Sequence, residues 1–185
     1  CWDGQRFCLA NNPLPNTGCW VYWPEKEWTM SRNHYLIVDL QAGPNAASYP
    51  VSYRSTPPIG GWTDEYKTTK LVLRRIPAGT FMMGSPKGEL GWFDGETQHQ
   101  VTLTKDFYVG VFEVTQKQWN LVMDAWPSWF LNAACRDSRP VEYVSYNDIR
   151  GSGAGLGWPN NSAVDADSFL GRLRAKTGLD FDLPT

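Results

Sequence analysis

Stretches in which apolar and polar residues alternate recur along the chain from residue 35 onward. Alternation predicts half-buried β-strands, because successive side chains of a strand point to opposite faces of a sheet. Alternating stretches, together with short apolar runs such as residues 35–38, predict strands at residues 35–40, 49–53, 70–76, 80–84, 100–104, 107–112 and 179–184. Turns rich in Gly, Pro and Asn separate them, so the pattern indicates many short strands joined by irregular loops.

A first helix is predicted after the strand at 107–112. Thr115 is a suitable N-cap, and Gln118 stands three residues later, where its side chain can complete a capping box. Pro127 is expected to end this helix. The apolar face of the helix consists of Trp119, Val122 and Met123.

A second helix is predicted to begin at Ser145, with Asp148 in the equivalent capping position. The glycine-rich segment 150–162 interrupts it, because each glycine weakens a helix by roughly 1 kcal/mol relative to alanine. Helical periodicity resumes from about Ala163, and Gly178 occupies the place of a C-cap glycine.

Composition indicates a folded globular protein: 42% of the residues are hydrophobic and 19% are charged. The net charge is −2 with no basic stripe, so we expect no nucleic-acid partner. No apolar run approaches the length of a membrane span. The chain starts at Cys1 without a signal peptide, and we expect it to be a piece of a longer protein. Nothing in the sequence indicates an oligomeric state.

A proline- and glycine-rich stretch at 56–61 suggests a linker, so two parts are predicted. Residues 1–66 form an accessory segment rich in Trp, Pro and Asn, with short strands. Residues 67–185 form a second unit.

Four cysteines are present, three of them before residue 20: Cys1, Cys8, Cys19 and Cys135. The spacings match no common zinc pattern. A disulfide would suit an extracytoplasmic protein in the periplasm, on the cell surface or secreted, and this is the location we expect. Free buried thiols and a metal or redox site remain open alternatives.

Aromatic residues are unusually frequent, with ten Trp, eight Tyr and eight Phe. Most are expected to fill a core made of short strands, since large rings bury much area per residue. Four tryptophans in loops or near helix ends form a possible ligand surface: Trp92, Trp126, Trp129 and Trp158. Trp158-Pro159-Asn160 resembles lectin-type calcium motifs, but no acidic partners stand beside it.

Five blocks in a fixed order carry a family resemblance: residues 76–85, 96–103, 112–119, 139–146 and 176–185. Over about residues 70–185 the chain resembles the N-terminal portion of the formylglycine-generating enzyme, or sulfatase-modifying factor, family. The resemblance implies an α+β, C-type-lectin-like fold, here incomplete, with two helices on short twisted antiparallel strands and much irregular loop. It also suggests a bacterial origin. The segment 150–162 is an insertion relative to most relatives.

The resemblance also implies where the family's chemistry lies. Its copper-binding cysteine pair and calcium ligands fall in a later portion of the domain, so we expect no catalytic, cofactor or metal residue in this segment. Cys135 is the single cysteine of the resembling region and cannot form a thiolate pair. The family also includes non-heme iron sulfoxide synthases with a histidine cluster, which His34 and His99 do not reproduce.

Two functions follow as hypotheses. The first is a truncated formylglycine-generating-enzyme-like domain whose catalytic half is not in this chain. The alternative is a non-catalytic C-type-lectin-like binding or display module for protein or glycan ligands. For this segment by itself we favour binding over catalysis.

Overall fold

The computed structural model describes residues 33–184, so Cys1, Cys8 and Cys19 lie outside the described residues. The strands are β1 (Tyr35–Asp39), β2 (Val51–Arg54), β3 (Lys70–Ile76), β4 (Gly79–Met83), β5 (His99–Leu103) and β6 (Phe107–Gly110). The α-helices are α1 (Glu65–Thr68), α2 (Gln116–Met123), α3 (Tyr146–Arg150) and α4 (Phe169–Thr177). Three short 3₁₀ helices complete the described elements: η1 (Asp94–Glu96), η2 (Arg136–Ser138) and η3 (Ala154–Gly157). The predicted α+β class is confirmed.

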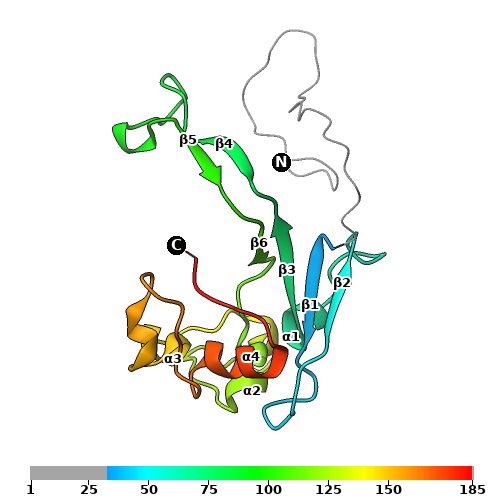
Figure 1. Ribbon diagram of the computed structural model, residues 1–185. Coiled ribbons are helices and arrows are strands. Elements are labelled where there is room, and N and C mark those ends of the chain that lie inside the picture. Colours follow the sequence, from blue (N-terminus) through cyan, green and yellow to red (C-terminus); the bar gives the residue numbers. More distant parts are fainter. Residues whose placement is uncertain (1–32, 185) are drawn as a thin grey trace. The chain divides into compact units, whose positions relative to one another are not determined.

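Two antiparallel sheets contain all six described strands (Figure 1). The larger sheet has the order β2-β1-β3-β6, and β4 pairs with β5 in the smaller one. In the larger sheet Val38 of β1 lies opposite Leu71 of β3, and Arg74 of β3 lies opposite Val109 of β6. β2 and β6 are therefore the two edges of the larger sheet.

The larger sheet extends across the predicted boundary between residues 66 and 67. β1 and β2 belong to the segment 1–66, yet β1 forms a full antiparallel ladder with β3. The stretch 56–61, predicted as a linker, connects β2 to α1 instead. A Pro/Gly-rich connection looks the same in sequence whether it joins two domains or two elements of one sheet.

β1 and β3 contain continuous apolar runs. Because successive side chains of a strand point to opposite faces, these runs place apolar side chains on both faces of the larger sheet. Leu36 and Val38 join a buried cluster with Trp119 of α2 and Phe169 of α4, whose rings stack 4.7 Å apart. Ile37 points the other way and packs in a smaller cluster next to α1. The two longer helices, α2 and α4, thus share one core with the sheet (Figure 1).

Side-chain caps define the starts of α2, α3 and α4. Thr115 accepts a hydrogen bond from the Gln118 N–H, and the Gln118 side chain accepts one from the Thr115 N–H at 2.8 Å. Ser145 and Asp148 form the same reciprocal pair at α3. Gly178 follows α4 with a φ of 69°, a left-handed conformation that glycine adopts without strain.

Two predicted helices and one predicted strand differ from the structure by more than the one- or two-residue shifts at other strand ends. α2 ends at Met123, before Pro127, because Asp124 adopts a left-handed conformation with a φ of 59°. α4 begins at Phe169, with Ser168 as its N-cap, and not at Ala163. The strand predicted at 179–184 is irregular backbone outside either sheet, with a turn closed by a hydrogen bond from the Phe181 N–H to the Leu179 carbonyl at 3.0 Å. No helix within residues 33–184 has the length and apolar character needed to cross a bilayer.

Candidate ligand-binding groove

A groove of about 780 Å³ lies between the edge strand β6 and the irregular segment 179–184. Its lining is mainly apolar and aromatic and includes Tyr53, Leu73, Tyr108 and Trp158. Three carboxylates also line it: Asp106, Asp180 and Asp182. The volume falls within the range typical of small-molecule and peptide sites, roughly 300–1,000 Å³.

Strand β6 forms one wall of the groove. Tyr108 donates a hydrogen bond to the backbone carbonyl of Asn33 at 2.8 Å, and its ring lies 6.5 Å from that of Tyr53. Burial raises the pKa of the Tyr108 hydroxyl, which therefore stays a neutral donor. At the start of β6, Asp106 accepts the Ala78 N–H and pairs with Arg75, and these contacts lower the pKa of that carboxyl.

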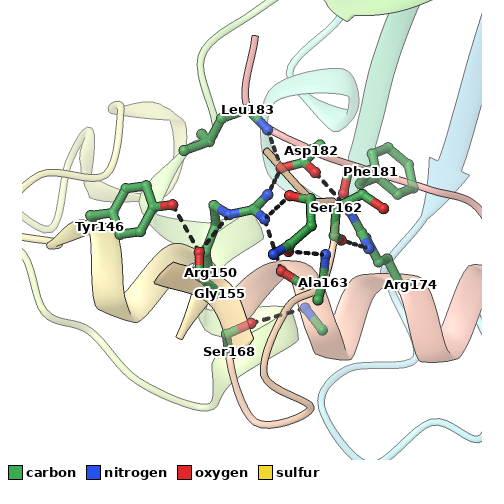
Figure 2. Close-up of polar contacts among 12 residues, drawn as sticks. Tyr146, Arg150, Gly155, Ser162, Ala163, Ser168, Arg174, Phe181, Asp182 and Leu183 are labelled. Carbon is green, nitrogen blue, oxygen red and sulfur yellow. Dashed lines mark hydrogen bonds and ion pairs between the residues drawn. The ribbon is translucent and has the colours of Figure 1, made fainter. Parts of the chain in front are cut away.

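The opposite wall, segment 179–184, is held by two arginines (Figure 2). Arg150 is completely buried and forms an ion pair with Asp182. Arg174 of α4 donates to the other Asp182 oxygen at 3.0 Å and to the Phe181 carbonyl at 2.7 Å. This segment is thus fixed by side chains rather than by a strand ladder.

The remaining donors of Arg150 organise the glycine-rich loop 150–162. The guanidinium donates to the carbonyl of Gly155 at 3.2 Å and to that of Ala163 at 2.8 Å (Figure 2). A Cβ on Gly155 would collide with the Arg150 carbonyl, so this close approach requires glycine. The Arg150 side chain therefore joins both ends of the loop to segment 179–184.

A carboxylate holds the same loop from the other side. Asp165 accepts the N–H of Gly153 at 2.8 Å and that of Gly155 at 3.2 Å. These backbone donors, Gly153 first, lower the pKa of the Asp165 carboxyl. The result is a fixed loop that places Trp158 at the groove, with the Arg150 guanidinium 5.0 Å from the centre of its ring.

The other tryptophans of the predicted ligand surface lie outside the groove lining. Trp129 is 78% exposed, and Trp126 lies against the Arg136 guanidinium at 3.8 Å. Trp92 donates its indole N–H to the carbonyl of Ser85 at 3.0 Å. Within residues 33–184 no aromatic pair joins any two of the four predicted tryptophans.

Of the groove residues, sequence reasoning singled out only Trp158 and missed the others, among them Tyr53, Tyr108, Asp180 and Asp182. They come from β2, β6 and segment 179–184, and each of these is separated from the next by more than 50 residues of chain. Arg150 had one local indication of a structural role: it stands directly before Gly151, where the glycine-rich segment begins. Nothing local to Asp182 indicates that it meets that arginine.

The described residues do not fit the thiolate-held copper of the family resemblance. Cys135 is the one cysteine among residues 33–184; it is half-buried and outside the groove. In that part of the chain no three His, Cys, Asp or Glu side chains gather as metal ligands would. His99 contacts the Thr97 carbonyl through Nδ1 at 3.0 Å.

Comparison with known protein families found a match over residues 63–153 to the family described as FGE-sulfatase, the sulfatase-modifying factor enzyme 1-like domain. The matched range runs from just before α1 to the start of the glycine-rich loop and contains four of the five sequence blocks. The predicted resemblance is confirmed over this range, whereas the last block, 176–185, lies beyond it. Neither the search of curated proteins nor that of solved structures found a match.

Proposed function

Since residues 63–153 form a domain of the FGE-sulfatase family, for which a C-type-lectin-like fold is implied, we propose that residues 33–184 act as a binding module. The ligand, a protein or a glycan, occupies the groove between β6 and segment 179–184. The observation that carries the proposal is the groove itself, about 780 Å³ in volume and lined by aromatic rings and carboxylates.

The chemistry of the groove suits a ligand with both apolar and polar faces. Tyr53 and Trp158 provide flat surfaces on which a sugar ring or an apolar side chain can pack. Tyr53 is 46% exposed, so its ring is available to a ligand. Asp180 adds an acceptor and a negative charge. Such a combination orients a ligand as well as binding it.

Catalysis of the formylglycine-generating type needs a pair of thiolates to hold copper. Residues 33–184 contain a single thiol, that of Cys135, and it does not line the groove. In our proposal, residues 33–184 therefore do not supply the copper or calcium sites of such oxidases. We further propose an extracytoplasmic location, which the three cysteines before residue 20 favour.

The proposal is tested by presenting the labelled 185-residue chain to a glycan array and to a peptide array. Trp158→Ala and Tyr53→Ala each remove a groove ring, and affinity for the retained ligand is expected to fall about tenfold, equivalent to about 1.4 kcal/mol. Trp129→Ala is the matched control, because Trp129 is exposed and lies outside the groove lining.

Two results would contradict the proposal. One is the failure of every glycan and peptide to bind. The other is an equal loss of affinity in Trp129→Ala and the groove variants. Trp158 also packs on Arg150, so its removal affects a structural contact as well as the groove. Circular dichroism therefore checks that Trp158→Ala is folded before its affinity is compared. The exposed Tyr53 provides the second, independent variant.

A further inference from the structure

Strand β6 has a free edge that faces the groove. The Val111 N–H donates to the Val72 carbonyl of β3 at 2.9 Å, and Val109 lies opposite Arg74. Backbone groups of alternate residues in a strand point to the same side, so Val109 and Val111 face β3. Tyr108 and Gly110 therefore direct their N–H and C=O groups away from β3.

These backbone groups have no partner of their own within residues 33–184. Tyr108 and Gly110 both line the groove, and no backbone hydrogen bond to another segment is found for either of them there. Segment 179–184, across the groove, belongs to neither sheet and includes a turn in which the Phe181 N–H donates to the Leu179 carbonyl at 3.0 Å. The space is thus bounded on one side by an unpaired strand edge and on the other by a wall held in place by Arg150 and Arg174.

We propose that the groove binds one extended strand of a partner polypeptide, which pairs with Tyr108 and Gly110 and adds a fifth strand to the β2-β1-β3-β6 sheet. This inference rests on the proposed binding function and names its ligand class. β6 has four residues, about 13 Å at 3.3 Å per residue, so the paired part of the partner is short. Edge-strand addition takes its affinity from main-chain hydrogen bonds and its specificity from alternate side chains.

The side chains of the groove specify the partner further. On β6 itself Phe107 and Val109 are exposed apolar side chains that line the groove, so the positions of the partner strand beside them should be apolar. Of the three carboxylates, Asp106 pairs with Arg75, and Asp182 pairs with Arg150 and Arg174. Asp180 is exposed, and none of the ion pairs or hydrogen bonds within residues 33–184 involves its carboxylate. A basic residue of the partner strand is expected to lie opposite it.

Charge also favours a different polypeptide over a second copy of this chain. The chain carries a net charge of −2, and edge-to-edge pairing of two β6 strands would bring two Asp180 side chains into one interface. Like charges placed close together in an interface disfavour association. A glycan, in turn, lacks the regularly spaced amide groups that Tyr108 and Gly110 can pair with.

The test uses the 185-residue chain and synthetic eight-residue peptides with valine at alternate positions, threonine between them and a lysine at one end. Two further versions of each peptide carry N-methyl groups on the odd or on the even backbone nitrogens. Strand pairing predicts that one methylated set loses binding and the other keeps it, because only alternate N–H groups face β6.

Hydrogen exchange provides the readout on the protein. The amides of Tyr108 and Gly110 should exchange at least about tenfold more slowly with the peptide bound, while the Val109 amide, already paired with β3, is unchanged. Asp180→Lys should weaken binding of the lysine peptide about two- to fivefold, as expected for an exposed ion pair. Glu89→Lys, an exposed substitution outside the groove lining, is the matched control and should leave the affinity unchanged.

The outcomes separate this inference from the proposed function. Peptide binding without protection of Tyr108 and Gly110, or with equal loss in both methylated sets, overturns strand pairing but not the binding function. Binding of glycans but of no peptide also overturns strand pairing and leaves the binding function intact. Protection that grows with protein concentration in the absence of peptide identifies a second copy as the occupant and overturns the partner proposal. Failure of all ligands overturns both proposals.

Discussion

Arg150 is the residue on which the groove wall depends most. Its side chain is completely buried, with the charge balanced by Asp182 and with carbonyls of Gly155 and Ala163 as further acceptors. A buried guanidinium is tolerable only when its donors are paired, since its desolvation is costly. The same side chain therefore joins α3, the glycine-rich loop and segment 179–184.

Replacing Arg150 by methionine should lower the free energy of unfolding by about 3 kcal/mol, because breaking a buried ion pair leaves unpaired polar groups behind. Urea denaturation of both chains measures the difference. Arg54→Met is the control: Arg54 is exposed on β2, and the change should stay within about 0.5 kcal/mol. A loss below about 1 kcal/mol for Arg150→Met would show that the buried pair is not important for stability.

At the scale of elements, the helices are specified by neighbours in the sequence and the glycine-rich loop by contacts further away. The capping boxes of α2 and α3 each involve residues three apart. The loop 150–162 instead closes on Asp165, whose carboxylate accepts backbone N–H groups from Gly153 and Gly155. Because its folded pKa is lowered by these donors, the ionised form of Asp165 stabilises the loop.

This loop clamp predicts a pH dependence of stability. A lowered folded pKa means that the stabilisation is present above the unfolded value, about 3.9, and is lost as the pH falls through the folded value. Asp165→Asn should therefore lower the melting temperature at pH 7, and the gap to the unmodified chain should narrow below about pH 4. Asp167 is an exposed carboxylate that makes no side-chain hydrogen bond within residues 33–184. Asp167→Asn should therefore change neither the melting temperature at pH 7 nor its dependence on pH. A gap that stays constant with pH would contradict the clamp.

At the scale of the molecule, the larger sheet and α2 and α4 form one core, and the groove lies where the sheet ends at β6. The core cluster includes residues from β1, β3, α2 and α4, and Tyr49 is tied to both α2 and α4 by hydrogen bonds. The groove wall at 179–184 follows α4 directly and is fixed by Arg174 of that helix. The position of the wall is therefore set by the same packing that forms the core.

Copper binding distinguishes a binding module from an oxidase for the whole chain. Titration of the reduced 185-residue chain with copper(I), with thiols counted before and after, should reveal no stoichiometric high-affinity complex. The physical reason is that a soft-metal site of this type needs at least two thiolates, whereas residues 33–184 supply one and the spacings of Cys1, Cys8 and Cys19 match no common zinc pattern. Tight one-to-one binding that protects two thiols from labelling would contradict the proposal, and Cys135→Ser would then show whether that cysteine takes part.

Prediction from the sequence succeeded where short-range patterns decide the structure. Six of the seven predicted strands overlap strands of the two sheets, and the family was identifiable from ordered blocks that the match over residues 63–153 confirms. The strand predicted at 179–184 shows the limit, because a strand exists only where a second one pairs with it. The sheet that continues across residues 66 and 67 shows the same limit, since ladder partners are not visible in a local pattern.

The sequence by itself determined which stretches are extended, where α2 and α3 begin and to which family the central residues belong, because alternation, capping and motif order depend on residues close together in the chain. Only the tertiary structure decided that Arg150 meets Asp182, that Trp158 and not Trp129 lines the groove, and that β6 keeps a free edge. These features join segments separated by tens of residues, and their positions follow from packing of the whole core rather than from any local preference.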